Sequence, residues 1–180
     1  SPIWDTGLAV HAMLEAGEPK NGARLNKAMR WMADRQVCDV SGDWATHRPG
    51  LRPGGWAFQY ANNHYPDVDD SAVVAMALDR ASDPKVKQGL PRAVEWIVGM
   101  QSKNGGWGSF DAENSHYHLN HIPFADHGAL LDPPTEDVTA RCVGMLAQIG
   151  DEAGNDAIER GLSYLRETQQ PDGSWYGSWG

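Results

Sequence analysis

Residues 92–107 read RAVEWIVGMQSKNGGW, and two related stretches occupy residues 27–44 and 160–175. Each contains, in order, a basic residue, a small residue, an aromatic residue, a glutamine and a final Gly-x-Trp. The three stretches begin at positions 27, 92 and 160, so their spacings are 65 and 68 residues. A fixed period with this many shared positions indicates a recurring supersecondary unit. We therefore interpret the chain as a structural repeat.

Two helices are expected in each repeat, and the second carries the repeated stretch. Apolar residues at helical spacing, such as Val94, Ile97 and Val98, support that placement. The glutamine is expected to end the helix and to bond backbone groups at the end of another helix. The glycines then let the tryptophan fold back and stack on the glutamine, which makes a structural clip. In the first repeat this assigns Gln36 to Gly42-Asp43-Trp44.

The first helix of each pair is expected to begin near Trp4, Asp69 and Pro133. For the last of these, Asp132 is the predicted cap, with Pro133 in the first turn and Gly150 just beyond the end. Long connections at about 37–66 and 102–131 separate the pairs. Loops of that length are usually functional or disordered, and the aromatic residues in these two favour order.

Composition narrows the class of protein. A chain of 180 residues accommodates one domain or a piece of one, and the absence of an initiating Met favours a segment of a larger protein. The formal charge of −9 argues against a nucleic-acid partner. No run approaches the roughly 20 apolar residues that span a bilayer. Cys38 and Cys142 have neither metal-ligand nor disulfide-framework spacing.

Carboxylates recur with the same period as the tryptophans, at Asp5, at Asp69 and Asp70, and at Asp137. If the helix pairs curve into a ring, these acids converge on its axis. A lone acid near a helix N-terminus has an ordinary explanation in the helix dipole, which favours it by up to about 1 kcal/mol. Three carboxylates within four residues, at Asp67, Asp69 and Asp70, repel one another and need a further reason.

Two reasons remain open for this crowding: a divalent cation, or a proton held at a raised pKa. The histidines of the neighbouring loops show no zinc-ligand spacing. Crowded carboxylates keep one member protonated near neutrality, as a general acid requires. Arg141, four residues after Asp137 on the same helical face, offers a cation for the conjugate base. An acid among many aromatic faces suits alkene protonation, because cation–π contacts and exclusion of water protect a carbocation.

The sequence motifs around these residues resemble those of the squalene–hopene cyclases along the whole chain, residues 1–180. The resemblance rests on the three Gln-Trp repeats and on five motifs: Ser1–Gly7, Gly54–Gln59, Tyr65–Asp70, Asn120–Phe124 and Asp132–Ala140. The Asp67-Val68-Asp69-Asp70 run is the most specific of them. The resemblance implies an all-α fold, an α/α toroid built as an incomplete (α/α)6 barrel from three helical hairpins. Residues 1–180 would form a single segment, about half of the catalytic barrel domain of a larger cyclase.

The same resemblance implies the surroundings of the site. Squalene is the expected lipid substrate, and neither a cofactor nor a metal is expected. A second helical barrel of the full-length chain would close the cavity. The full-length protein would lie peripherally on the cytoplasmic face of a bacterial membrane, while the segment alone would be soluble. Apolar surface left where the ring continues favours self-association, so a homodimer is among the expected states.

The resemblance also implies roles for individual residues. Asp69 would be the proton donor, supported by Asp67 and Asp70, with Asp5 and Asp137 as further acids. Residues expected to contact the substrate are Trp4, Phe58, Gln59, Phe110 and Trp179, together with Phe124 and Ala125 at the constriction through which substrate enters. Three positions depart from the family pattern. Arg141 replaces a common histidine and cannot relay a proton, Phe110 replaces a common tyrosine, and His127 replaces a common phenylalanine.

We therefore expect cyclisation of squalene to hopene, or to hopanol where water captures the last cation. A cyclase of the same group with another polyprenoid substrate is the near alternative. A helical toroid that only binds or scaffolds is the distant alternative, and a metal assay or an Asp69→Asn variant separates it. The isolated segment is expected to be inactive, because a wall of its cavity is absent.

Overall fold

The computed structural model describes residues 1–116, 118–119 and 131–177. This part of the chain contains six α-helices and a two-stranded antiparallel ladder. The helices are α1 (Pro2–Glu15), α2 (Ala23–Ala33), α3 (Val68–Asp79), α4 (Leu90–Met100), α5 (Glu136–Ile149) and α6 (Asn155–Thr168). The strands are β1 (Trp56–Ala57) and β2 (Pro66–Asp67). The all-α class is confirmed, with a short β-ladder inside the first long connection.

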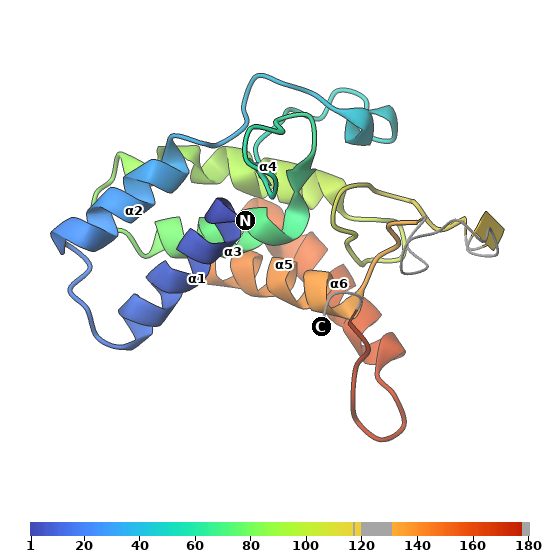
Figure 1. The fold of residues 1–180 in the computed structure, drawn as a ribbon. Helices are drawn as coiled ribbons and strands as arrows, with labels where there is room; N and C mark the ends of the chain where they lie inside the picture. The colour runs from blue at the N-terminus through green and yellow to red at the C-terminus, as the bar shows by residue number, and fades with distance from the viewer. Residues whose placement is uncertain (117, 120–130, 178–180) are drawn as a thin grey trace.

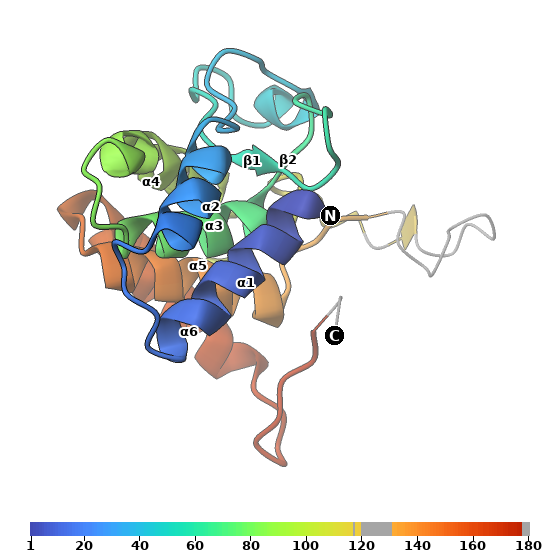
Figure 2. The ribbon, with the colours of Figure 1, turned by 60° about the vertical axis from the view of Figure 1, so that its left-hand side comes forward.

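The helices form three hairpins, α1–α2, α3–α4 and α5–α6, as Figure 1 shows. The first helices lie side by side with α3 between α1 and α5, and each second helix packs against its own partner (Figure 2). This double layer of helices is the arrangement expected of a toroid segment. Because α3 is covered on several sides, ten of its twelve residues are buried, including Asp69 and Asp70.

A glutamine and a tryptophan follow the second helix of each hairpin, and in the second hairpin the glutamine links it to the third. The Gln101 amide donates to the carbonyls of Gly105 (2.7 Å) and Ala157 (2.9 Å), and so links the end of α4 to the start of α6. The Trp107 indole N–H donates to the Ile97 carbonyl at 2.7 Å. The predicted bond from the glutamine to another helix is therefore confirmed here. The tryptophan is held by a separate hydrogen bond, to the carbonyl of the residue four positions before the glutamine.

The assignment of Trp44 to the first clip is wrong. Gln36 donates to the Gly54 carbonyl at 2.7 Å, and the indole N–H of Trp56 donates to the Met32 carbonyl at 2.7 Å. These bonds match those of the second repeat, so the first clip uses Gly54-Gly55-Trp56, and residues 37–53 take the place of the shorter segment 102–104. Trp44 is buried edge-on against Trp96, with ring centroids 5.9 Å apart.

Helix α5 begins later than predicted, at Glu136, with Thr135 as its N-cap. Asp132 does not cap it, and Pro133 is not in its first turn. Prolines 133 and 134 hold the residues before them in extended conformations, which delays the helix. The Thr135 N–H also bonds the Trp107 carbonyl at 3.0 Å, in an isolated antiparallel bridge. The predicted end is confirmed, because Gly150 is a left-handed C-cap with φ of 70°.

The hydroxyls of Ser71 and Thr139 fix how α3 and α5 correspond. Ser71 Oγ accepts the Trp56 N–H at 2.7 Å, and Thr139 Oγ1 accepts the Trp107 N–H at 3.0 Å. Asp69 and Asp137 both lie two residues before these hydroxyls, so Asp69 corresponds to Asp137. The acid period of 65 and 67 residues, counted from Asp5 through Asp70 to Asp137, predicts Asp70 as the counterpart of Asp137, and this prediction is one residue out of register. A one-residue shift turns a side chain by about 100° around a helix.

None of the helices in the described ranges combines the length and apolar character needed to cross a membrane.

Candidate active site

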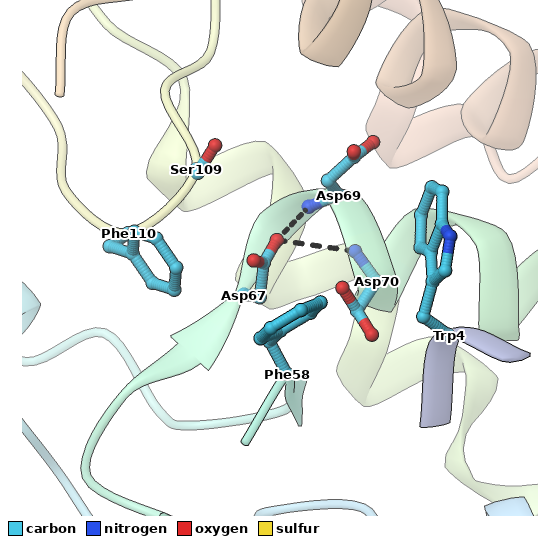
Figure 3. A pocket seen from close by; sticks show the side chains of 7 residues that line it. All are labelled: Trp4, Phe58, Asp67, Asp69, Asp70, Ser109 and Phe110. Atoms are coloured by element: carbon cyan, nitrogen blue, oxygen red, sulfur yellow. Dashed lines mark hydrogen bonds between the residues drawn. The ribbon is translucent and has the colours of Figure 1, made fainter. Parts of the chain in front are cut away.

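The acid run lies where β2 passes into α3. Asp67 pairs with Trp56 across the ladder and is also the N-cap of α3. Its Oδ1 accepts the backbone N–H groups of Asp69 at 2.7 Å and of Asp70 at 3.2 Å. The Asp69 and Asp70 carboxyls leave the helix in different directions, and Asp70 points toward Phe58 and Trp4 (Figure 3). Asp67 thus orders the turn that presents the other two acids.

These three acids open onto one cavity of about 270 Å³, whose exposed lining is mostly apolar. Its remaining walls are Trp4 from α1, Phe58 after β1, and Ser109 with Phe110 from the loop that follows Trp107. Closed pockets for drug-sized ligands span roughly 300–1,000 Å³. The described cavity lies just below that range. It places carboxyl groups against aromatic faces.

Arg141 of α5 lies behind the acid run. Its Nη2 donates to Asp69 Oδ2 at 2.8 Å, and its Nε donates to Asp69 Oδ1, so the contact is bidentate. Arg141 also lies 3.7 Å from Asp137 Oδ2, one turn earlier on α5. Its guanidinium carbon is 5.7 Å from the Trp4 ring centroid. One cation therefore joins corresponding acids of the second and third hairpins.

Burial shapes the acidity of the run. It raises the pKa of Asp67 to about 8, with a further contribution from the charge of Asp70. It likewise raises the pKa of Asp70 to about 7, with help from the charge of Asp69. Burial also raises the pKa of Asp69, but the hydrogen bonds and charge of Arg141 oppose that rise. The site thus holds protons near neutrality beside a carboxyl whose ionised form has a paired cation.

One carboxyl oxygen of Asp70 lacks a hydrogen-bond donor in the part of the chain that the structure describes. Asp70 Oδ1 is buried and has no hydrogen-bond partner among the described residues. An ionised oxygen left in that state would carry a large desolvation cost, whereas a protonated carboxyl reduces that cost. The geometry of Asp70 and its raised pKa therefore agree.

The other predicted residues lie in several places. The Asp5 side chain is 74% exposed, on the side of α1 that faces solvent in this chain, and its charge contributes to the raised pKa of Asp70. Gln59 lines a neighbouring apolar cavity of about 320 Å³, which shares Phe58 and Phe110 with the first. Phe124, Ala125, His127 and Trp179 lie outside the described residues.

Sequence reasoning missed two features of the site. Ser109 lines the cavity, and its carbonyl accepts the Val68 N–H at 2.7 Å, next to the acid run. No pattern in the sequence marks that serine. Asp132 was assigned to the start of α5, but its carboxylate bonds the loop of residues 109–111. The Asp-Pro-Pro sequence was a usable signal, because it forces an extended chain that frees the carboxylate for other partners.

Among the described residues, no group of three or more His, Cys, Asp or Glu side chains is arranged to hold a metal ion.

Comparison with known proteins adds the family. Residues 1–180 match the family described as the squalene–hopene cyclase C-terminal domain. The whole chain is 57% identical to a squalene–hopene cyclase of Zymomonas mobilis and 50% identical to one of Alicyclobacillus acidocaldarius. It is 55% identical to a probable squalene–hopene cyclase of Sinorhizobium fredii.

The chain spans 28% to 29% of the length of these curated relatives. It also aligns over its full length, at 40% identity, with the enfumafungin synthase of Hormonema carpetanum. The matched residues include the acid run, the cavity wall and all three clips that hold the hairpins together. The chain therefore belongs to the squalene–hopene cyclase family, within the C-terminal domain of that family.

Proposed function

We propose that the full-length protein containing this chain cyclises squalene to hopene and hopanol by a proton-initiated reaction. One observation carries the proposal: three carboxyl groups and three aromatic side chains line a single apolar cavity, with an arginine fixed behind Asp69. An acid in that setting can protonate an alkene, and the aromatic faces can stabilise the cation that results. Each known relative named above as a squalene–hopene cyclase supports the same reaction for this chain.

Asp69 is the proposed proton donor. The O–H bond of its carboxyl breaks, the proton joins the terminal carbon of the alkene, and the alkene π electrons form the new C–H bond. A tertiary carbocation and the Asp69 carboxylate result. The bidentate contact with Arg141 stabilises that carboxylate, which makes Asp69 a stronger acid than burial alone would allow. Asp137 holds Arg141 from the other side.

Asp67 and Asp70 are the proposed reserve of protons. The pKa of about 8 leaves Asp67 largely protonated at neutral pH, and the pKa of about 7 leaves Asp70 about half protonated, unlike an ordinary aspartate. The cycle closes when the final cation loses a proton to give hopene, or when water adds to it and the adduct loses a proton to give hopanol. A proton must then return to Asp69. Arg141 cannot carry it because the guanidinium stays charged, so the neighbouring acids are the proposed route.

Trp4, Phe58 and Phe110 are the proposed groups that stabilise the first cation. The three rings surround the cavity into which the acids open (Figure 3). A cation above an aromatic face gains about 2 kcal/mol or more once water is excluded. Gln59, in the adjoining cavity, is the proposed polar contact beyond Phe58.

The remaining surroundings are proposals of the same kind. The described cavity closes one end of a substrate site, so a second helical barrel of the same chain is proposed to complete it. Residues 1–180 are proposed to form about half of the catalytic barrel and to be inactive alone. The full-length protein is proposed to act at a membrane surface, on the cytoplasmic face, because its substrate is a lipid.

Asp69→Asn in the full-length protein tests the proposal. We expect this variant to lose squalene turnover while the melting temperature stays near that of the unsubstituted protein. Asp79→Asn is the matched control, because Asp79 lies at the other end of the same helix and pairs with Lys87 instead. Undiminished turnover by the Asp69 variant would contradict the donor assignment. A full-length protein that converts another polyprenoid but not squalene would instead favour the alternative substrate.

A further inference from the structure

A single carboxylate organises one wall of the cavity. Asp132 Oδ1 accepts the Ser109 N–H at 2.9 Å, and Oδ2 accepts the N–H groups of Phe110 at 2.5 Å and Asp111 at 2.8 Å. Asp132 comes 21 to 23 residues after them in the sequence. Three consecutive backbone donors that converge on one side chain fix a loop far better than a single bond does, because each bond restricts a different peptide.

The backbone beside this carboxylate is shaped to receive it. A Cβ on Gly108 would stand 2.6 Å from the Asp132 carbonyl oxygen and 2.9 Å from Asp132 Oδ2. Only a residue without a side chain allows the loop to approach so closely. Gly108 therefore packs directly against Asp132. This close packing is an observation independent of the hydrogen bonds.

The same loop is bonded to the acid run. The Ser109 carbonyl accepts the Val68 N–H at 2.7 Å, at the first residue of α3 and next to Asp69. Phe110, whose N–H is held by Asp132, lines the cavity with Asp67, Asp69 and Asp70. The path from Asp132 to the reacting end of the cavity thus runs from its carboxylate to the amides of residues 109–111, and from the Ser109 carbonyl to the Val68 amide.

We propose that Asp132 is a positioning residue, which holds the Phe110 ring at a set place and distance from the Asp67–Asp70 run. Asp132 itself does not line the cavity, so it acts through the loop of residues 108–111. This inference rests on the proposed function and adds a specificity role to it. A Phe110 ring that moves would stabilise cations less well and would let water or a base intercept them earlier. The product mixture should therefore respond as well as the rate.

The first arm of the test measures backbone order in the full-length protein. Amide hydrogen exchange is followed in a peptide that covers residues 107–113, for the unsubstituted protein, Asp132→Asn and Gly108→Ala. Each lost hydrogen bond should speed exchange at Ser109, Phe110 or Asp111 by about tenfold. Asp151→Asn is the matched control, because Asp151 also accepts a backbone N–H, from Ala153 at 2.9 Å, but lies between α5 and α6. Unchanged exchange in both test variants would overturn the proposal.

The second arm asks whether the effect passes through Phe110. Squalene turnover and the ratio of hopene, hopanol and less-cyclised products are measured for Asp132→Asn, Phe110→Ala and the double variant. We expect Asp132→Asn to change the product ratio by about fivefold alone and by less than about twofold in the Phe110→Ala background, since residues in one path couple. An equal effect in both backgrounds would overturn the proposal, even if exchange had increased.

The two arms separate this inference from the function beneath it. If the unsubstituted full-length protein does not cyclise squalene, the proposed function fails, and the positioning role for that reaction fails with it. The exchange arm would still show whether Asp132 holds the loop. If the protein does cyclise squalene and Asp132→Asn leaves the product ratio unchanged, the function stands and the positioning role is refuted. Melting temperatures of all variants identify any that fail to fold.

Discussion

Replacing Arg141 with glutamine removes a cation that contacts Asp69 through two hydrogen bonds. Two unit charges about 4 Å apart near a protein surface attract by about 4 kcal/mol. The Arg141 side chain is 33% exposed and Asp69 is 12% exposed, so solvent screens part of this attraction. Halving the figure for screening leaves about 2 kcal/mol of attraction that the variant loses.

Loss of this cation raises the pKa of Asp69, because the cation had favoured the ionised carboxyl. Asp69 then becomes a weaker acid, and proton transfer to the alkene slows. The rate of general acid catalysis changes by less than the acidity of the catalyst does. We therefore expect kcat to fall by about tenfold while KM changes little. The alkaline limit of activity should move to higher pH, because Asp69 keeps its proton longer. A slower enzyme that is active at higher pH is the distinctive result.

The assay measures kcat and KM for squalene with the full-length protein, over a range of about pH 5 to pH 9. Arg141→Lys keeps the charge but loses the bidentate geometry, so we expect a smaller loss, of about threefold. Arg52→Gln is the matched control, because Arg52 also pairs with a carboxylate, Glu95, on an exposed surface away from the cavity. Turnover by Arg141→Gln within twofold of the unsubstituted protein, with no shift of the pH limit, would refute the reasoning.

Three further predictions concern stability and can be checked by urea unfolding. Because folding raises the pKa of Asp70 to about 7, the folded protein binds a proton that the unfolded chain releases. Stability therefore falls between about pH 4 and pH 7, and Asp70→Asn should recover on the order of 2 kcal/mol at pH 8 and nothing near pH 4. Gln101→Ala removes two buried amide bonds and should cost about 2 kcal/mol, against less than about 1 for Gln169→Ala, whose bond to the Gly173 carbonyl is exposed. Gly105→Ala should cost about 3 kcal/mol, since its φ is +92° and its new Cβ would stand 2.4 Å from a carbonyl of α6. Gly173→Ala has a φ of +93° but open space, and should cost about 1 kcal/mol. Equal losses within either pair, or a gain by Asp70→Asn at both pH values, would contradict these estimates.

Local sequence patterns were enough to predict the helical hairpins. The spacing of apolar residues and the position of Gln101 before a glycine turn are short-range features, so the helix pairs followed from them. The first clip shows where this reasoning ends. Gly42-Asp43-Trp44 has the same Gly-x-Trp pattern as the true partner of Gln36, but it is the indole of Trp56, twelve residues later, that bonds the Met32 carbonyl. Spacing cannot choose between two matching tryptophans, whereas hydrogen bonds can.

The acid run was visible in the sequence for a physical reason. Three carboxylates in four residues are unfavourable unless something offsets their repulsion, so Asp67, Asp69 and Asp70 stood out without any structure. The sequence did not predict which of Asp69 and Asp70 corresponds to Asp137, because a repeat period that varies by a few residues cannot resolve a shift of one residue. The hydroxyls of Ser71 and Thr139 decided it.

By itself, the sequence determined the repeat, the helical class and the acid run, because these depend on neighbours along the chain. The tertiary structure decided which groups meet across it. Arg141 reaches Asp69 over 72 residues, and Asp132 reaches the amide of Ser109 over 23 residues. No local preference encodes such a contact. It exists because stacked hairpins bring the starts of α3 and α5 together, where a buried carboxylate must find donors or a cation.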